Sequence, residues 1–102
     1  MEEDWKADYL AAKAGNRHKG LYQRWKEMPS NEIEKSIRSL RIQIDVHLDK
    51  IANPDKYIKE NLSQQQRDGL IYRYWPKEIL NFRQQIYIFT GILQERNHEK
   101  TS

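Results

Sequence analysis

Residues 31–52 carry apolar side chains that recur at steps of four and three residues. The members of this stripe are Ile33, Ile37, Leu40, Ile44, Leu48 and Ile51. Because each residue of an α-helix turns the chain by about 100°, the six side chains fall within an arc of about 80°. The spacing therefore predicts a helix with one buried face. Ser30 or Asn31 is expected to cap this helix, with Glu34 completing a capping box from Asn31, and Asn53-Pro54 to end it.

A second apolar stripe follows Pro76, a residue that suits the first turn of a helix. Its members are Ile79, Phe82, Ile86, Phe89 and Leu93, and Ile88 and Ile92 widen it to one side. A wide stripe needs more than one neighbour, so we expect the two long helices, each about 30 Å long, to pair antiparallel. Shorter helices are expected over residues 3–14 and 20–28 and after a Ser63–Gln66 capping box, with a loop or single turn over 55–62.

These patterns predict an all-α fold, a small helical bundle built on two long antiparallel helices with two or three shorter helices. No segment alternates convincingly as a strand, and 102 residues suffice for one core. We therefore expect a single helical domain over residues 1–102. Within it, residues 1–16 are expected to be linker-like or a peripheral helix, and residues 97–102 a frayed tail.

The composition excludes several classes of protein. The chain has no Cys, so it forms neither disulfides nor a thiolate zinc site. No apolar run approaches the roughly 20 residues that a membrane span needs, and no signal-peptide pattern opens the sequence. The sequence also lacks a Gly-rich phosphate loop, G-x-S-x-G and H-E-x-x-H. We accordingly expect no membrane span and no cofactor.

Positive charge is concentrated near the N-terminus, although the net charge is only +3. There is no acidic residue between Asp8 and Glu27. That stretch holds Lys13, Arg17, Lys19, Arg24 and Lys26, interleaved with Tyr9, Tyr22 and Trp25. Such a patch can attract phosphates, and the expected substrate-binding residues are Arg17, Lys19, Tyr22, Arg24 and, from the first long helix, Gln43. The alternative is a solvated helix pair whose lysines lie over aromatic rings.

The octet HLDKIANP, residues 47–54, holds the main candidate for chemistry, His47. On a helical wheel His47 lies about 20° from Leu40, inside the apolar arc, whereas Asp45 and Asp49 lie on the opposite side. This arrangement excludes a metal site that combines His47 with both aspartates, and we expect no metal ligands. Gln43 and Lys50 stand four residues before and three residues after His47, so the three side chains are expected to converge.

A histidine and a lysine at the edge of a core can transfer protons and hold a phosphate. We therefore expect His47 and Lys50 to be catalytic, with His18 contributing from the basic RHKG segment. One histidine would deprotonate an attacking hydroxyl and the other would protonate the leaving oxygen. In that case His47→Ala should abolish activity at a nearly unchanged melting temperature. The alternative, which the pattern leaves open, is a partly buried structural histidine that bonds Gln43 or a facing backbone.

Three segments in this order, HKGLYQRW, IEKSIRSLRIQIDVHLDKIANPDKYI and LIYRYWPKEILNFRQQIYIFTGIL, resemble a known domain. It is the small helical C-terminal toxin domain of bacterial polymorphic toxins of the Rhs and contact-dependent inhibition types. The shared motifs are His18 with Gly20, the I-R-S-L of residues 37–40, H-x-x-K-I-x-N-P at residues 47–54 and Trp75-Pro76. The resemblance covers residues 17–95.

The resemblance implies a toxin tip that is secreted or delivered, as part of a larger protein, into the cytoplasm of a target bacterium. There a cognate immunity protein would normally neutralise it. Such tips are mostly enzymes and often nucleases, so we expect an effector domain that acts on nucleic acid. RNA and DNA are both candidate targets, with or without a metal, and the pattern predicts no particular oligomeric state.

Two other functions are compatible with the sequence. The first is a non-enzymatic helical interaction module, such as an adaptor, an inhibitor or an immunity-type protein. Its contact surface would be formed by Ile88, Ile92 and Tyr87 on the last helix. The second is nucleic-acid binding without cleavage, which predicts an affinity that falls steeply with salt.

Overall fold

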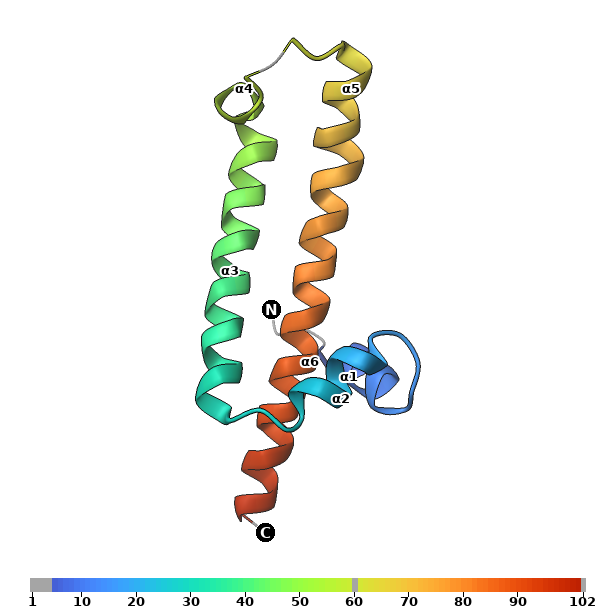
Figure 1. The fold of residues 1–102 in the computed structure, drawn as a ribbon, viewed down its shortest axis with the longest axis vertical. Coiled ribbons are helices and arrows are strands. Elements are labelled where there is room, and N and C mark those ends of the chain that lie inside the picture. The colour runs from blue at the N-terminus through green and yellow to red at the C-terminus, as the bar shows by residue number, and fades with distance from the viewer. Residues whose placement is uncertain (1–4, 60, 102) are drawn as a thin grey trace.

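The computed structural model describes residues 5–59 and 61–101, and these form helices without any strand. In chain order the elements are α1 (Trp5–Lys13), α2 (Lys19–Trp25), α3 (Ser30–Ala52), α4 (Pro54–Tyr57), α5 (Gln64–Gly69), the π-helical turn η1 (Leu70–Tyr74) and α6 (Trp75–Thr101). Figure 1 shows α3 antiparallel to α6, with α4 at one end of the pair and α1 and α2 near the other. The predicted all-α bundle on two long antiparallel helices is confirmed.

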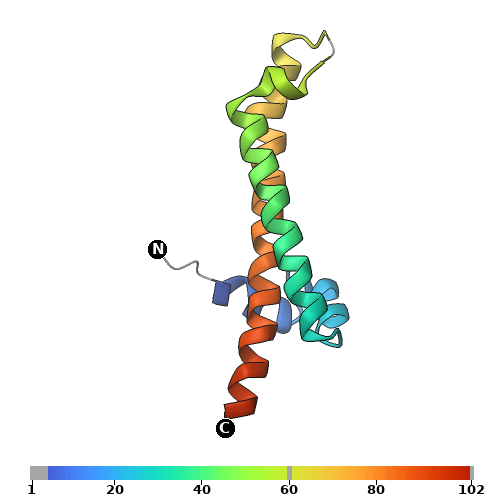
Figure 2. The same cartoon turned by 90° about the vertical axis from the view of Figure 1, so that its left-hand side faces the viewer.

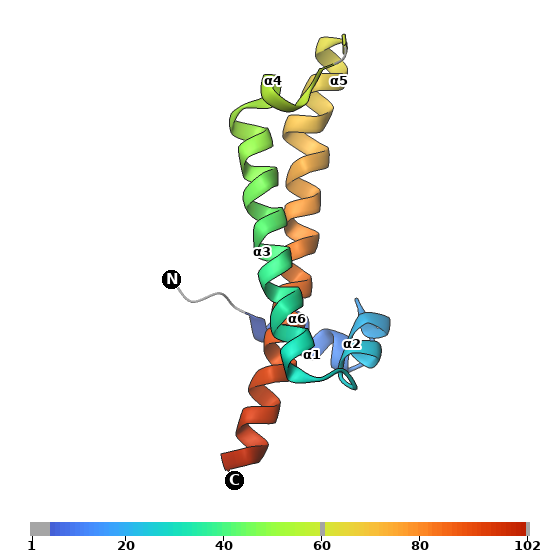
Figure 3. The same cartoon turned by 60° about the vertical axis from the view of Figure 1, so that its left-hand side comes forward.

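The pairing of α3 with α6 gives the molecule an elongated form. Buried isoleucines of both helices, among them Ile44, Ile79 and Ile86, meet along the contact. Figures 2 and 3 show α3 running beside α6 over most of its own length. The extents are 57 × 27 × 25 Å and the radius of gyration is 16.5 Å. A compact domain of about 100 residues would have a radius of gyration of about 13 Å.

The α5, η1 and α6 segments form one helix that runs without interruption from Gln64 to Thr101. The predicted capping box opens it, with Ser63 and Gln66 bonded reciprocally. The sequence predicted a separate short helix before Pro76 and a new helix from Pro76 onward, and this prediction is wrong. Proline lacks an N–H donor and crowds the carbonyl four residues earlier. A π turn directly before it, in which the Trp75 N–H bonds the Leu70 carbonyl five residues back, lets the helix continue.

The first helix belongs to the core. Tyr9 and Ala12 of α1 are buried together with Ile88 and Ile92 of α6, so α1 is neither a linker nor peripheral. Residues 1–4 of the expected N-terminal segment lie outside the described residues. The predicted contact surface on the last helix is wrong for Ile88 and Ile92, which are 0% and 4% exposed. At the other end α6 remains helical over residues 97–101, where a frayed tail was expected.

The start of α3 lacks the predicted capping box. Ser30 is already helical, and no side chain caps the helix at its N-terminus. The segment that leads into α3 is held by Arg96 of α6, which donates to Ser30 Oγ (2.9 Å) and to the backbone carbonyls of Lys26 (2.8 Å) and Met28 (2.6 Å). One guanidinium therefore ties the link between α2 and α3 to α6.

At Gly91 α1 packs directly against α6. A Cβ placed on Gly91 would lie 2.2 Å from two ring atoms of Tyr9. The Tyr9 hydroxyl donates to Glu95, and the Lys13 ammonium pairs with the same carboxylate. Burial and the bond to Glu95 raise the pKa of Tyr9, while Lys13 and Tyr9 lower the pKa of Glu95. The missing side chain at Gly91 thus allows the ring and its charged partners to lie against α6.

We expect Gly91→Ala to destabilise the fold by about 1–3 kcal/mol, because the added methyl group must displace the Tyr9 ring and with it α1. The free energy of unfolding in urea measures this effect.

The matched control is Gly69→Ala in α5. Gly69 has helical φ and ψ angles (−59°, −43°), and a Cβ there meets no atom within 4 Å. Alanine should stabilise the protein at this position by about 0.4–1 kcal/mol. Equal effects of the two substitutions would contradict the packing argument.

Candidate functional site

His47 is buried between α3 and α6. The residue is 5% exposed, and the edge of its ring meets Phe82 with the ring centroids 5.2 Å apart. Its Nδ1 donates to the backbone carbonyl of Gln43 at 2.8 Å, and its Nε2 contacts Oε2 of Glu78. The stripe prediction was wrong for the next residue, because Leu48 is 46% exposed and His47 takes the place toward α6.

His47 and Glu78 form a pair with one buried and one exposed end. A carbonyl only accepts hydrogen bonds, so Nδ1 of His47 carries a proton. The contact with the Glu78 carboxyl group is made through the other ring nitrogen, Nε2. The side chain of His47 is 7% exposed and that of Glu78 is 36% exposed, so the carboxyl group is the end that solvent and ligands reach.

The exposed end of this pair borders a hollow of about 360 Å³, here called the Glu78 hollow. Its lining consists of Arg17, Tyr74, Lys77, Glu78, Leu80 and Asn81. This volume falls within the range of small-ligand sites. The charged residues of the lining are Arg17, Lys77 and Glu78, so its formal net charge is +1. The hollow therefore attracts anions and offers them a carboxyl group, a phenol and an amide.

Arg17 reaches this hollow because the next residue is anchored to α6. His18 has a left-handed backbone conformation (φ 65°), which few residues other than glycine adopt. Its Nε2 donates to Oε1 of Gln84 at 3.0 Å, and Gln84 is itself buried. Gln84 lies about one helical turn beyond Leu80 and Asn81, so the bond holds Arg17 beside them. His18 acts here as a positioning residue.

The structure does not bring His18 and His47 together. They bind Gln84 and Glu78 of α6 respectively. Six residues along a helix correspond to about 9 Å along the axis and about 120° around it. The two imidazoles therefore meet different faces of α6, which separates the general acid from the general base of the sequence-based hypothesis.

Lys50 and Gln43 do not converge with the His47 ring either. The Lys50 ammonium lies 5.9 Å from the ring centroid of Tyr57 and 5.8 Å from that of Trp75, an arrangement typical of cation–π contacts. Trp75 is itself buried, at 7% exposed. Gln43 contributes its backbone carbonyl to His47, and the residue is exposed.

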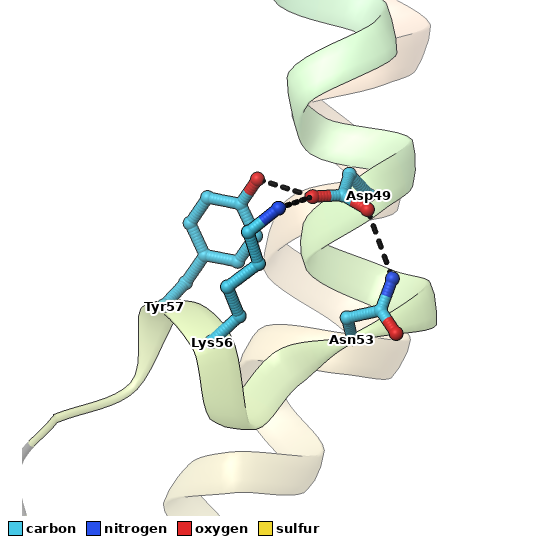
Figure 4. A network of polar contacts seen from close by, with 4 residues as sticks. All are labelled: Asp49, Asn53, Lys56 and Tyr57. Carbon is cyan, nitrogen blue, oxygen red and sulfur yellow. Dashed lines mark hydrogen bonds and ion pairs between the residues drawn. The ribbon is translucent and has the colours of Figure 1, made fainter.

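Asp49 fixes the position of Tyr57 (Figure 4). The Lys50 ammonium in turn lies over the Tyr57 ring. The Asp49 carboxylate accepts hydrogen bonds from the Tyr57 hydroxyl, from Lys56 Nζ at 3.1 Å and from Asn53 Nδ2 at 2.9 Å. These donors, Tyr57 first, lower the pKa of Asp49 from its ordinary 3.8 to about 2. The network folds α4 back against the end of α3.

The rest of the basic stretch is distributed around α1 and α2. Lys19 and Arg24 are exposed on α2, and the half-buried Tyr22 packs edge-on against Tyr9 at 5.8 Å. The Lys13 and Lys26 ammonium groups both lie 5.8 Å from a ring, of Tyr9 and of Tyr22 respectively. Each interpretation of this stretch therefore fits some of its residues. Lys13 and Lys26 lie over aromatic rings, as in a solvated helix pair, whereas Arg17 lines the Glu78 hollow, where it can meet an anion.

The sequence analysis missed four polar lining residues, all on one helix. Tyr74, Lys77, Glu78 and Asn81 recur at steps of three and four, which places them on one face of the long helix. That polar face was visible in the sequence as the complement of the apolar stripe. In the described residues no group of three or more His, Cys, Asp or Glu side chains is arranged to hold a metal ion. No helix in the described part of the chain could cross a membrane.

We expect His47→Ala to lower the free energy of unfolding by about 2–4 kcal/mol, because it leaves a cavity and removes the partner of Glu78. This differs from the sequence-based expectation of an unchanged melting temperature, and the reason is the burial of His47. Thermal and urea unfolding measure the loss. Leu48→Ala, at the adjacent exposed position, should cost about 0.5 kcal/mol or less. A His47 variant as stable as the Leu48 variant would show that the buried pair contributes nothing to stability.

The docking of α4 should depend on the charge of Asp49. A carboxyl group whose pKa is lowered by folding stabilises the fold above its ordinary pKa, and this contribution is lost as the pH falls through the folded value. We therefore expect α4 to stay docked above about pH 4 and to be released toward pH 2, as followed by the NMR signals of the Tyr57 ring.

Asp49→Asn should release Tyr57 even at neutral pH, whereas Asp45→Asn, an exposed aspartate one turn earlier, should leave it docked. An unchanged Tyr57 spectrum in the Asp49 variant would refute this account of the network.

Comparisons with protein-family models, with curated proteins and with solved structures found no match to this chain. The functional argument therefore depends on the geometry and charge of the Glu78 hollow.

Proposed function

We propose that the chain is an antagonistic effector domain that cleaves nucleic acid at the Glu78 hollow. The observation that carries this proposal is the position of the Glu78 carboxyl group. His47 holds it from behind, and it opens into a hollow that also holds Arg17 and Lys77. A phosphodiester needs a proton acceptor for the attacking oxygen and positive charge for the non-bridging oxygens. This lining supplies both.

The proposed step requires only side chains of the hollow. Glu78 accepts the proton of the attacking hydroxyl, of a ribose or of water, as the new oxygen–phosphorus bond forms. The Lys77 ammonium donates a proton to the leaving oxygen as the old bond breaks, and solvent then returns both groups to their starting states. Arg17 binds the non-bridging oxygens through its planar guanidinium. His47 keeps the carboxyl group oriented from the protein side.

The biological setting of the proposal comes from the resemblance to polymorphic toxin tips. Such a domain acts inside a competing bacterium and is neutralised by a cognate immunity protein. An immunity protein that covers the Glu78 hollow would need acidic side chains to match the net positive charge of its lining. His18, which anchors Arg17, and His47, which holds Glu78, then act as positioning residues.

A second candidate is a non-enzymatic interaction module. Three large apolar or aromatic side chains on the long helix are solvent-exposed: Tyr72 (73%), Tyr74 (59%) and Leu80 (52%). Exposed aromatic residues are common at the centres of protein interfaces. This surface replaces Ile88 and Ile92, which α1 covers. Of these three residues Tyr74 and Leu80 line the Glu78 hollow, so the two candidates compete for that part of the surface.

Purified protein incubated separately with RNA and with DNA tests the enzymatic proposal. Glu78→Gln preserves the shape of the side chain and a hydrogen bond to His47 but removes the proton acceptor. Its cleavage rate should fall by about 10²–10⁴-fold, with unchanged helical content and melting temperature. Glu34→Gln, an exposed position on α3, is the matched control and should cleave as fast as the wild type.

The same variants can be expressed in a bacterium, alone and beside the neighbouring gene product. Growth arrest by the wild type and by Glu34→Gln, relieved by the neighbour and absent with Glu78→Gln, would support the effector proposal. Failure to cleave either nucleic acid, or full activity of Glu78→Gln, would overturn it in favour of the interaction module.

A further inference from the structure

A second hollow continues the first along the same helix. It has a volume of about 550 Å³, and its lining includes Leu62, Gly69, Leu70, Arg73, Tyr74 and Lys77. Tyr74 and Lys77 line both hollows. We call the two together the long-helix track. Gln66 also lines the second hollow and Asn81 the first, so the track covers about 22 Å of the helix at 1.5 Å per residue.

The chemistry of the track alternates along its length. The second hollow has an apolar part, formed by Leu62 and Leu70, and Gly69 adds no side chain to it. Arg73 and Lys77 supply positive charge beside it, and Arg17 extends that charge into the Glu78 hollow. Tyr74 lines both hollows, and it is solvent-exposed. Apolar or aromatic surface thus lies within one or two turns of each cation.

This alternation fits a chain whose flat, apolar bases are linked by negatively charged phosphates. Proteins that hold single strands combine a positively charged groove with aromatic side chains on which bases stack. In a duplex the bases are paired and stacked on one another, so their faces cannot reach a tyrosine on a convex helix. An unpaired base can lie on the Tyr74 ring while its neighbouring phosphates meet Lys77 and Arg17.

We infer that the long-helix track binds single-stranded nucleic acid, with one base stacked on Tyr74 and the adjoining phosphodiester held at Lys77 and Arg17. The inference deepens the proposed function, on which it rests for the identity of the cleaved bond: the diester next to the stacked base lies opposite Glu78. The binding itself is measured without any cleavage.

The test uses Glu78→Gln protein and fluorescent oligonucleotides of about 4–16 nucleotides, the range of site sizes known for single-strand-binding folds. Single strands and duplexes of the same sequence, as RNA and as DNA, are compared by fluorescence anisotropy. We expect single strands to bind at least about tenfold more tightly than duplexes. Tyr74→Leu, which keeps an apolar side chain but removes the ring, should weaken single-strand binding about tenfold. Ile42→Ala, at an exposed apolar position on α3, should leave it unchanged.

A salt titration tests the phosphate contacts. Removing one cation that binds a single-strand phosphate should reduce the slope of log affinity against log salt by about 0.7. Lys77→Gln should show this reduction, and Lys35→Gln, exposed on α3, should not. Equal affinity for duplexes, no effect of Tyr74→Leu or an unchanged slope in Lys77→Gln would each overturn the inference.

The outcomes also separate the inference from the proposed function. Selective single-strand binding by a wild-type protein that cleaves nothing would uphold the track and overturn the nuclease proposal. Cleavage of duplex and single strand at equal rates, with no dependence on Tyr74, would uphold the nuclease and overturn the track.

Discussion

The close contact between Tyr9 and Gly91 determines where the first part of the chain lies on α6. Only a residue without a side chain at position 91 leaves room for the Tyr9 ring, and Glu95 one turn later holds both the Tyr9 hydroxyl and the Lys13 ammonium. With α1 fixed in this way, the turn that follows returns to α6 at Gln84. The position of Arg17 in the Glu78 hollow, more than 70 residues away in sequence from Gly91, depends on that packing.

A second polar contact divides the long interface between α3 and α6. His47 occupies a place in the apolar stripe where an aliphatic residue would pack without needing partners. Burying an imidazole is unfavourable unless both nitrogens are bonded, and here the Gln43 carbonyl and Glu78 satisfy them. Because Glu78 bonds His47 in one register of the two helices, the pair favours that register over slipped alternatives. Glu78 also lines the Glu78 hollow, and its side chain remains 36% exposed.

The sequence predicted the helices well and the site only in part, for a physical reason. Periodicity identifies which face of one helix is buried, so the α3 and α6 stripes followed from the isoleucines alone. It does not specify the axial register between helices, and the partners of His47 and His18 on α6 are set by that register. Continuation of the helix through Pro76 depends on a π turn, which has no periodic signature. Lys50 lies beside His47 on the helical wheel, but the Lys50 ammonium lies over the rings of Tyr57 and Trp75 instead. Asp49 holds Tyr57 in that place through its hydroxyl.

The charge of the long-helix track distinguishes its two candidate partners. Three cations, Arg17, Arg73 and Lys77, line the track beside a single carboxyl group, that of Glu78, so an approaching molecule meets a net positive charge. A protein partner would best meet the exposed Tyr72, Tyr74 and Leu80 with a continuous apolar patch surrounded by charge. In the track the cations instead alternate with the aromatic and apolar side chains along the helix. A molecule that itself alternates a flat apolar group with a negative charge matches this order at each step, and a nucleic-acid strand with unpaired bases is such a molecule.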